Sequence, residues 1–73
     1  MNNDNERDLL ISLAKRVKQL RLEKGLTQED AYNDTGIHFG RIEQGNRDLS
    51  FTSIKKVSGY FGLTLEEFFS EGF

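Results

Sequence analysis

The chain contains no cysteine and no proline among its 73 residues, and it has one histidine. Without cysteine it cannot form a disulfide. One histidine with scattered carboxylates supplies neither a metal-ligand cluster nor a nucleophile paired with a base. The sequence therefore predicts no metal site, no cofactor and no enzymatic activity, and it shows no motif for a small-molecule ligand.

Long hydrophobic segments are also absent, since the longest apolar run is Leu9-Leu10-Ile11. A membrane span needs roughly 20 apolar residues, and the polar residues 1–5 lack the basic start and apolar stretch of a signal peptide. We expect a cytoplasmic protein with no membrane partner. Residues 1–5 are predicted to be a disordered tail, and residues 6–73 a single domain whose one core comes from a few packed helices.

An excess of positive charge is the third absence. Ten Lys and Arg against twelve Asp and Glu give a formal net charge of -2, which provides no general attraction to nucleic acid. The distribution is uneven, because cations crowd residues 15–24, Arg41 and Arg47 bracket a second segment, and acidic residues lie at both ends. A local basic face is therefore compatible with an acidic chain, although we expect Lys15, Arg16 and Lys18 to be a solvated face rather than a DNA contact.

Apolar residues recur at helical spacing in segments that end at glycines. The first segment predicts an amphipathic helix over about 6–24, stopped by Gly25, with Leu9, Leu10, Leu13, Val17 and Leu20 on its apolar face. Thr27 is placed to cap a short second helix over about 28–34. A turn at 34–36 then leads to a third helix over about 37–44.

Two more helices complete the pattern. Ser50 caps a fourth helix that runs to residue 61, and Gly62 closes it. Its predicted buried stripe consists of Phe51, Ile54, Val57 and Phe61. Thr64 and Glu67 form a capping box that begins a last helix over about 65–70. Five helices without strand-like alternation predict an all-α domain.

Two short helices joined by a glycine turn, behind a longer first helix, form the helix-turn-helix arrangement, in which the second of the pair enters the major groove. The residues at 20–30 (LRLEKGLTQED), 35–37 (TGI) and 41–47 (RIEQGNR) resemble the XRE family of phage repressors, Cro-like proteins and restriction-modification controllers. The resemblance covers nearly the whole chain. It implies a five-helix lambda-repressor-like domain that binds double-stranded DNA.

The resemblance also assigns roles to individual residues. The counterparts of Arg21 and Glu43 form a partly buried ion pair that joins the first helix to the end of the recognition helix; the alternative is two solvated surface charges. At the start of the second helix, the counterpart of Gln28 and the adjacent backbone N–H hold a DNA phosphate. We place Thr27 and Gln28 in the DNA-binding set, with an ordinary solubilising helix start as the alternative.

Between Thr27 and Glu43 the chain is about three residues shorter than the family pattern, so base contacts cannot be transferred residue by residue. If Ile37, Phe39 and Ile42 face the core, then four other side chains or backbone positions face DNA: His38, Gly40, Arg41 and Gln44. Gly40 costs about 1 kcal/mol relative to alanine inside a helix, which indicates a close approach of its backbone to DNA or to the neighbouring helix.

Arg41 can bond bidentately to guanine O6 and N7, or it can hold a phosphate. His38 is open between a DNA contact and an ordinary surface role. Gln44, Asn46 and Arg47 fall in the loop after the recognition helix, where family members contact the sugar-phosphate backbone; the alternative is a plain polar loop.

The C-terminal part is rich in aromatic residues, namely Tyr60, Phe61, Phe68, Phe69 and Phe73. Exposed aromatic patches mark interfaces, and repressors of this type dimerise through their last helices. We expect a homodimer interface at Tyr60, Phe68, Phe69 and Phe73, unless all five complete the core. The predicted function is a homodimeric transcriptional repressor with the helix at 37–44 in the major groove. The alternative is a protein-interaction module, or an antitoxin-like partner, with little DNA binding.

Overall fold

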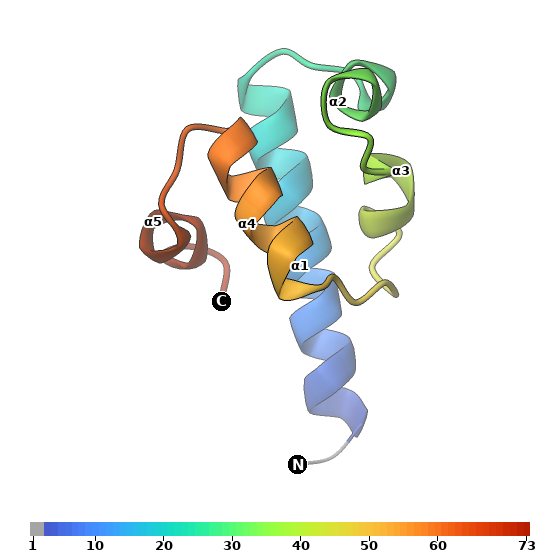
Figure 1. Ribbon diagram of the computed structural model, residues 1–73. Helices are drawn as coiled ribbons and strands as arrows, with labels where there is room; N and C mark the ends of the chain where they lie inside the picture. The colour runs from blue at the N-terminus through green and yellow to red at the C-terminus, as the bar shows by residue number, and fades with distance from the viewer. Residues whose placement is uncertain (1–2) are drawn as a thin grey trace.

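The computed structural model describes the backbone of residues 3–73 and the side chains from Asn5 onward. Within that range the chain forms five α-helices and no strand, which confirms the all-α prediction. The helices are α1 (Asn3–Glu23), α2 (Gln28–Thr35), α3 (Phe39–Ile42), α4 (Phe51–Tyr60) and α5 (Leu65–Phe69). Figure 1 shows α1 as a long axis with α2 and α3 on one side of it and α5 on the other.

Helix α1 begins earlier than the sequence predicts. A disordered tail was expected over residues 1–5, but α1 already includes Asn3, Asp4 and Asn5; Met1 and Asn2 lie outside the described residues. Asn and Asp are favoured at helix starts, and acidic side chains there are stabilised by the helix dipole. The early turns therefore need no apolar face, and in Figure 1 they extend beyond the other helices.

Glycines end α1 and α4 as the sequence predicts. At the end of α1 the amide of Gly25 donates to the carbonyl of Leu22, and the amide of Leu26 donates to that of Arg21. Together these bonds form a Schellman motif, which requires a left-handed residue, and Gly25 supplies it with φ 69°. Gly62 ends α4 with the same bonding pattern. At both places the chain turns away from the direction of the helix that ends there.

The core lies where the five helices meet. All five helices contribute fully buried residues to it, namely Val17, Ala31, Phe39, Val57, Ser58 and Phe68. Phe39 packs edge-on against Phe61 with ring centroids 6.0 Å apart. Because α3 places both Phe39 and Ile42 in this core, the short helix is fixed in position, and its other side chains face outward.

Two residues predicted to be buried are exposed. Phe51 was assigned to the apolar stripe of α4, yet it is 72% exposed. It is the first residue of α4, and helical side chains lean toward the helix N-terminus, so Phe51 leans past the end of the core. Leu9 is 53% exposed, because it lies in the part of α1 that extends beyond the other helices. Within the described residues, no helix is long and apolar enough to span a bilayer.

Candidate nucleic-acid interface

The start of α2 is fixed by a capping box. The Thr27 hydroxyl accepts a hydrogen bond from the Asp30 amide, and the Thr27 amide donates to the Asp30 carboxylate, each over 3.0 Å. The backbone N–H of Thr27 and then its hydroxyl lower the pKa of Asp30. The predicted cap is therefore present. Thr27 and Gln28 are both exposed beside it, with the positive end of the α2 dipole behind them.

The turn between α2 and α3 is closed by local hydrogen bonds. The Thr35 hydroxyl donates to the Ala31 carbonyl over 2.7 Å and accepts from the Ile37 amide over 3.0 Å. Gly36 follows with φ 76°, a left-handed conformation that favours glycine. This turn sets the direction in which α3 leaves α2.

Helix α3 is shorter than predicted. It was expected over 37–44, but it covers Phe39–Ile42, with His38 as its N-cap. Residues 43–45 continue as turns, and Gly45 has φ 85°. His38, Arg41 and Gln44 are exposed, as the predicted orientation requires. Phe39 and Ile42 are buried and Ile37 is half-buried against the core.

Arg21 and Glu43 form the ion pair that the family resemblance implied. The Arg21 Nε atom lies 2.8 Å from Glu43 Oε2 and its Nη2 lies 2.8 Å from Glu43 Oε1. Its Nη1 donates to the Leu26 carbonyl over 2.8 Å. The two side chains are 8% and 4% exposed, so each charge depends on the other for compensation. Removing one partner of such a pair costs about 3–5 kcal/mol, which ties the end of α3 firmly to α1.

Gln28 is joined to the same network. Its amide nitrogen donates to Glu43 Oε1 over 3.2 Å. A Cβ atom placed on Gly40 would lie 3.2 Å from the Gln28 side-chain oxygen. α3 therefore lies close to the start of α2 at Gly40, which agrees with the neighbouring-helix explanation of this glycine. Ala at position 40 would require the Gln28 side chain to move.

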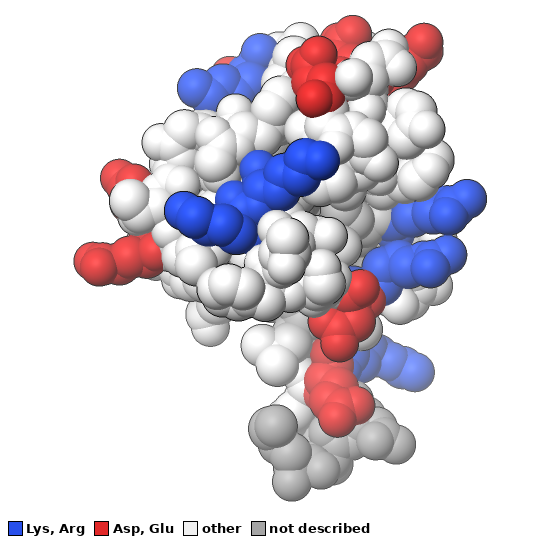
Figure 2. All heavy atoms as spheres, viewed as in Figure 1, with Lys and Arg blue, Asp and Glu red and all other residues white. Residues whose placement is uncertain are grey.

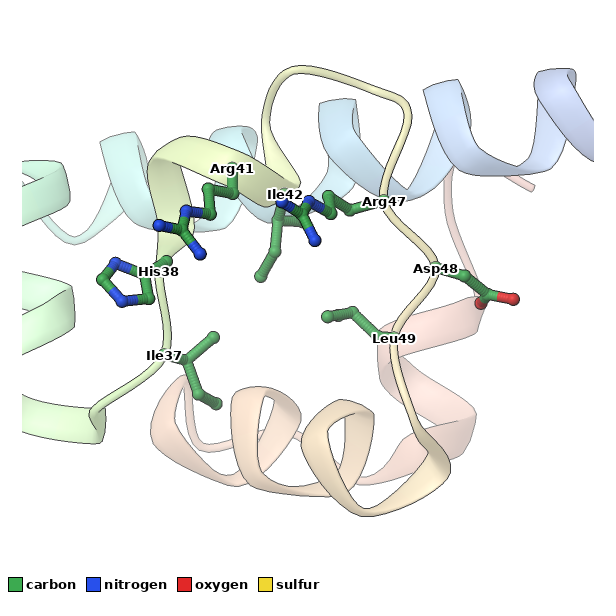
Figure 3. A pocket seen from close by; sticks show the side chains of 7 residues that line it. All are labelled: Ile37, His38, Arg41, Ile42, Arg47, Asp48 and Leu49. Atoms are coloured by element: carbon green, nitrogen blue, oxygen red, sulfur yellow. The ribbon is translucent and has the colours of Figure 1, made fainter.

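Arg41 and Arg47 line one hollow beside α3. Its volume is about 190 Å³, and it is lined by Ile37, His38, Arg41, Ile42, Arg47, Asp48 and Leu49. In Figure 3, Arg47 reaches across Ile42 toward Arg41, Arg41 lies next to His38, and the carboxylate of Asp48 points away. Arg41, Asn46 and Arg47 are exposed. Among the residues that the structure describes, neither arginine takes part in the two ion pairs, Arg16–Glu71 and Arg21–Glu43.

Acidic groups lie nearby on α2. Figure 2 shows Lys and Arg atoms at the edge where α3 and the following segment lie, with Asp and Glu atoms above them over α2. Two of these carboxylates have partners within the chain, since Asp30 belongs to the cap and Asp34 accepts from the Tyr60 hydroxyl over 2.6 Å. This face therefore carries both signs, with the cations concentrated around α3.

The aromatic residues predicted for a dimer interface occupy three environments. Phe68 is fully buried in the core, so it presents no surface to a partner. Tyr60 is half-buried and packs against Phe39 and Phe61. Phe69 and Phe73 are 44% and 50% exposed and contact each other with centroids 5.1 Å apart. These two line an apolar groove of about 300 Å³ together with Leu9, Leu10, Leu13, Asp48 and Ile54.

Three features at these surfaces were not foreseen from the sequence. Ile37 and Leu49 line the hollow beside the arginines rather than serving only the core. His38 stacks on Tyr32 of α2 with centroids 4.4 Å apart. Arg16, which was expected to be solvated, is buried and donates to the Phe68 and Glu67 carbonyls of α5. None of these contacts is encoded by local spacing.

Comparisons with known proteins agree with this geometry. Residues 17–68 match a family model described as helix-turn-helix. A control protein from a Mycoplasma species, C.MunI, is 34% identical to the chain over 68 residues, which cover 88% of this chain and 92% of that protein. No solved structure matches the chain. The matched segment contains α2, α3 and α4 completely, together with the second part of α1.

Proposed function

Because the chain belongs to the XRE-type helix-turn-helix family of DNA-binding transcriptional regulators, we propose that it binds a specific double-stranded DNA site as a homodimeric repressor. In this proposal α3 enters the major groove. One observation carries it: two exposed arginines, Arg41 and Arg47, share the hollow beside the helix that the core and the Arg21–Glu43 pair hold in place.

The dimensions of α3 suit this role. An α-helix with its side chains is about 10–12 Å across, and the major groove is about 12 Å wide. The groove therefore admits α3 together with its flanking turns. On this placement His38 and Arg41 face base edges, since they are the exposed side chains at the start and on the outer side of α3. A guanidinium paired with guanine O6 and N7 is the commonest specific contact.

Contacts to the DNA backbone come from the two flanks of α3. Thr27 and Gln28 lie at the start of α2, where the Thr27 hydroxyl accepts the cap bond but keeps its own hydrogen for donation. One hydrogen of the Gln28 amide is directed to Glu43 and the other is available to a phosphate. On the other flank, Gln44, Asn46 and Arg47 are exposed in the segment after α3. Phosphate contacts on both sides would fix the register of Arg41.

The acidic net charge is compatible with this function. Glu43 is paired with the cation of Arg21, whereas Asp30 and Asp34 accept hydrogen bonds from neutral donors and keep their negative charge. Repulsion from DNA therefore comes from the carboxylates of α2 and of the two ends of the chain, and not from the end of α3. We expect modest non-specific affinity, so that specific contacts supply a large share of the binding free energy.

Repression requires only that the dimer occupies its site and blocks the polymerase. A twofold dimer reads two half-sites about one DNA turn apart. The exposed pair Phe69 and Phe73 supports self-association, and the likeness to a control protein supports a regulatory role. The same surface would serve a protein-interaction module, which is the second candidate function.

In vitro selection from random duplex DNA tests the proposal directly. We expect a twofold-symmetric site to be enriched and its affinity to fall steeply between about 50 and 200 mM salt, because phosphate contacts release counterions. Measured in parallel, binding to a scrambled duplex gives the non-specific reference. If no duplex is enriched at about 50 mM salt, the DNA-binding function is wrong and the protein-interaction alternative takes its place.

A further inference from the structure

The hollow beside α3 has an apolar side that phosphate binding does not explain. Arg41, Arg47, His38 and Asp48 form its polar rim, with the Asp48 carboxylate pointing away from the hollow, and Ile37, Ile42 and Leu49 form its apolar wall. Figure 3 shows Ile37 and Leu49 directed into the hollow from the side opposite the arginines. Both are half-buried against the core, whereas Ile42 is almost fully buried.

A phosphate gains nothing from apolar walls, because burying a charged group beside them costs solvation. The guanidinium groups could hold a phosphate equally well on a flat polar surface. Water in a hollow with such walls is in turn readily displaced by an apolar group. The wall chemistry therefore selects a ligand that has an apolar part next to hydrogen-bond acceptors.

The major groove of DNA offers such a ligand in one form. The 5-methyl group of thymine is its characteristic apolar feature, and guanine O6 and N7 are acceptors that match a guanidinium. Neighbouring bases along a strand lie about 3.4 Å apart, so the rim and the wall of one hollow can face adjacent base pairs. A methylated pyrimidine beside guanine would satisfy both parts together.

We propose that this hollow takes the 5-methyl group of a pyrimidine, thymine in unmodified DNA, beside a guanine contacted by Arg41. Ile37 and Leu49 are then specificity-determining residues that contact the methyl group. The inference rests on the proposed DNA-binding function and adds to it the identity of one base and the residues that read it.

The DNA side of the test uses the unaltered protein, so folding does not affect it. Each thymine of the selected site is replaced in turn by deoxyuridine, which removes only the methyl group. We expect one thymine per half-site to show about a fourfold loss of affinity, which corresponds to about 0.8 kcal/mol for one buried methyl-sized group. The other thymines should change affinity by less than twofold. Two further duplexes carry either 5-methylcytosine–guanine or cytosine–guanine in place of the sensitive thymine–adenine pair. If the hollow reads the methyl group itself, the methylated duplex binds more tightly than the unmethylated one.

Variants of the protein test which wall residues contact the methyl group. Leu49→Ala should abolish the difference between thymine and uracil at the sensitive position, and Ile37→Val should reduce it. Leu63→Ala is the matched control, because Leu63 is also half-buried against the core but does not line the hollow. It should keep the full fourfold difference, whatever its effect on stability. Because thymine and uracil are compared for the same variant, a general loss of folding cancels.

The outcomes separate this inference from the proposed function. If no site is selected, DNA binding is wrong and the methyl contact falls with it. If a site is selected but every uracil substitution stays within twofold, the DNA-binding function stands and the hollow does not read a methyl group. The same conclusion follows if a sensitive thymine exists but Leu49→Ala leaves the difference intact.

Discussion

Arg41 and Arg47 share one hollow, but they stand on different supports. Arg41 lies on α3, between Phe39 and Ile42, which are both in the core. Arg47 lies in the segment after α3, outside any helix. A side chain on a fixed helix suits base reading, which needs precise geometry, whereas a side chain on a loop can follow a phosphate.

This difference predicts distinct effects of removing each arginine. Arg41→Ala should weaken binding to the selected site by about 1–3 kcal/mol and relax discrimination at one base pair. Arg47→Ala should weaken all duplexes alike and reduce the salt slope by about 1. Both effects are measured by titrating selected and scrambled duplexes at several salt concentrations.

Lys56→Ala provides the control for charge alone, since Lys56 is exposed on α4 and does not line the hollow. This variant should change the affinity for the selected and the scrambled duplex only slightly. An equal loss on selected and scrambled DNA for Arg41→Ala would make Arg41 a phosphate contact instead of a base contact.

The exposure of the residues on α3 could be predicted from the sequence, whereas the partners of Arg16 could not. Lys15, Arg16 and Lys18 were all expected to be solvated. Lys15 and Lys18 are exposed, but Arg16 is buried. Its Nε atom donates to the Phe68 carbonyl over 2.8 Å and its Nη2 to the Glu67 carbonyl over 3.0 Å. Both carbonyls lie in the last turn of α5, and that of Glu67 also accepts from the amide and the hydroxyl of Ser70. A contact between residues 51 and 52 positions apart leaves no signal in local periodicity.

At the scale of the elements, helix boundaries were predictable where a local signal specifies them. The caps at Thr27, Ser50 and Thr64 and the stops at Gly25 and Gly62 are all present. The limits of α3 were not predictable, because hydrogen bonds within the turn that precedes it shorten it at the start. The Ile37 amide is taken by the Thr35 hydroxyl, and the Phe39 amide donates back to the Ile37 carbonyl in a tight turn. Residues 37 and 38 are thereby held outside the helix.

Tyr60 joins α4 to α2 through its hydrogen bond to Asp34. This bond raises the pKa of Tyr60 from 10.0 to about 12, with desolvation adding to it. The folded chain therefore holds the phenolic proton more tightly than the unfolded chain does. The stabilisation is complete below pH 10 and is lost as the pH rises from 10 toward about 12.

Tyr60→Phe tests this connection. The variant should be slightly less stable than the parent chain at pH 8, by about 0.5–1.5 kcal/mol for one hydrogen bond. The stability difference should shrink between pH 10 and about 12, which chemical unfolding at each pH measures. Tyr32→Phe is the control, because Tyr32 is also partly exposed but packs on His38. A difference between Tyr60→Phe and the parent that stays constant across this range would show that the bond to Asp34 does not stabilise the fold.

For the molecule as a whole, the two candidate surfaces are built from largely different elements. The arginine hollow is formed by residues 37–49, around α3. The apolar groove joins α1, the start region of α4 and the C-terminal segment, with Asp48 as the residue that both surfaces share. A second protein copy on the groove would thus leave α3 accessible to DNA. This arrangement is what a dimeric regulator requires, because dimerisation and DNA reading must occur together.

Self-association through the groove can be tested at its two exposed aromatic residues, Phe69 and Phe73, which also contact Phe68 of the core. The Phe69 and Phe73 side chains are each about half exposed, and Phe69→Ser or Phe73→Ser removes an aromatic ring from the groove. We expect either change to raise the dimer dissociation constant at least about tenfold, which is about 1.4 kcal/mol. Sedimentation equilibrium over a range of concentrations measures this constant. Phe51→Ser is the matched control, since Phe51 is more exposed and lies outside the groove.

The DNA readout then distinguishes loss of dimerisation from damage to the fold. A dimer-deficient variant with an intact α3 should bind an isolated half-site as well as the parent chain does, yet lose the added affinity for two half-sites placed about one turn apart. Equal losses on half-sites and full sites would indicate a damaged fold. A parent chain that remains monomeric at high micromolar concentration and binds the two half-sites independently would contradict the homodimer and leave the groove for a different partner.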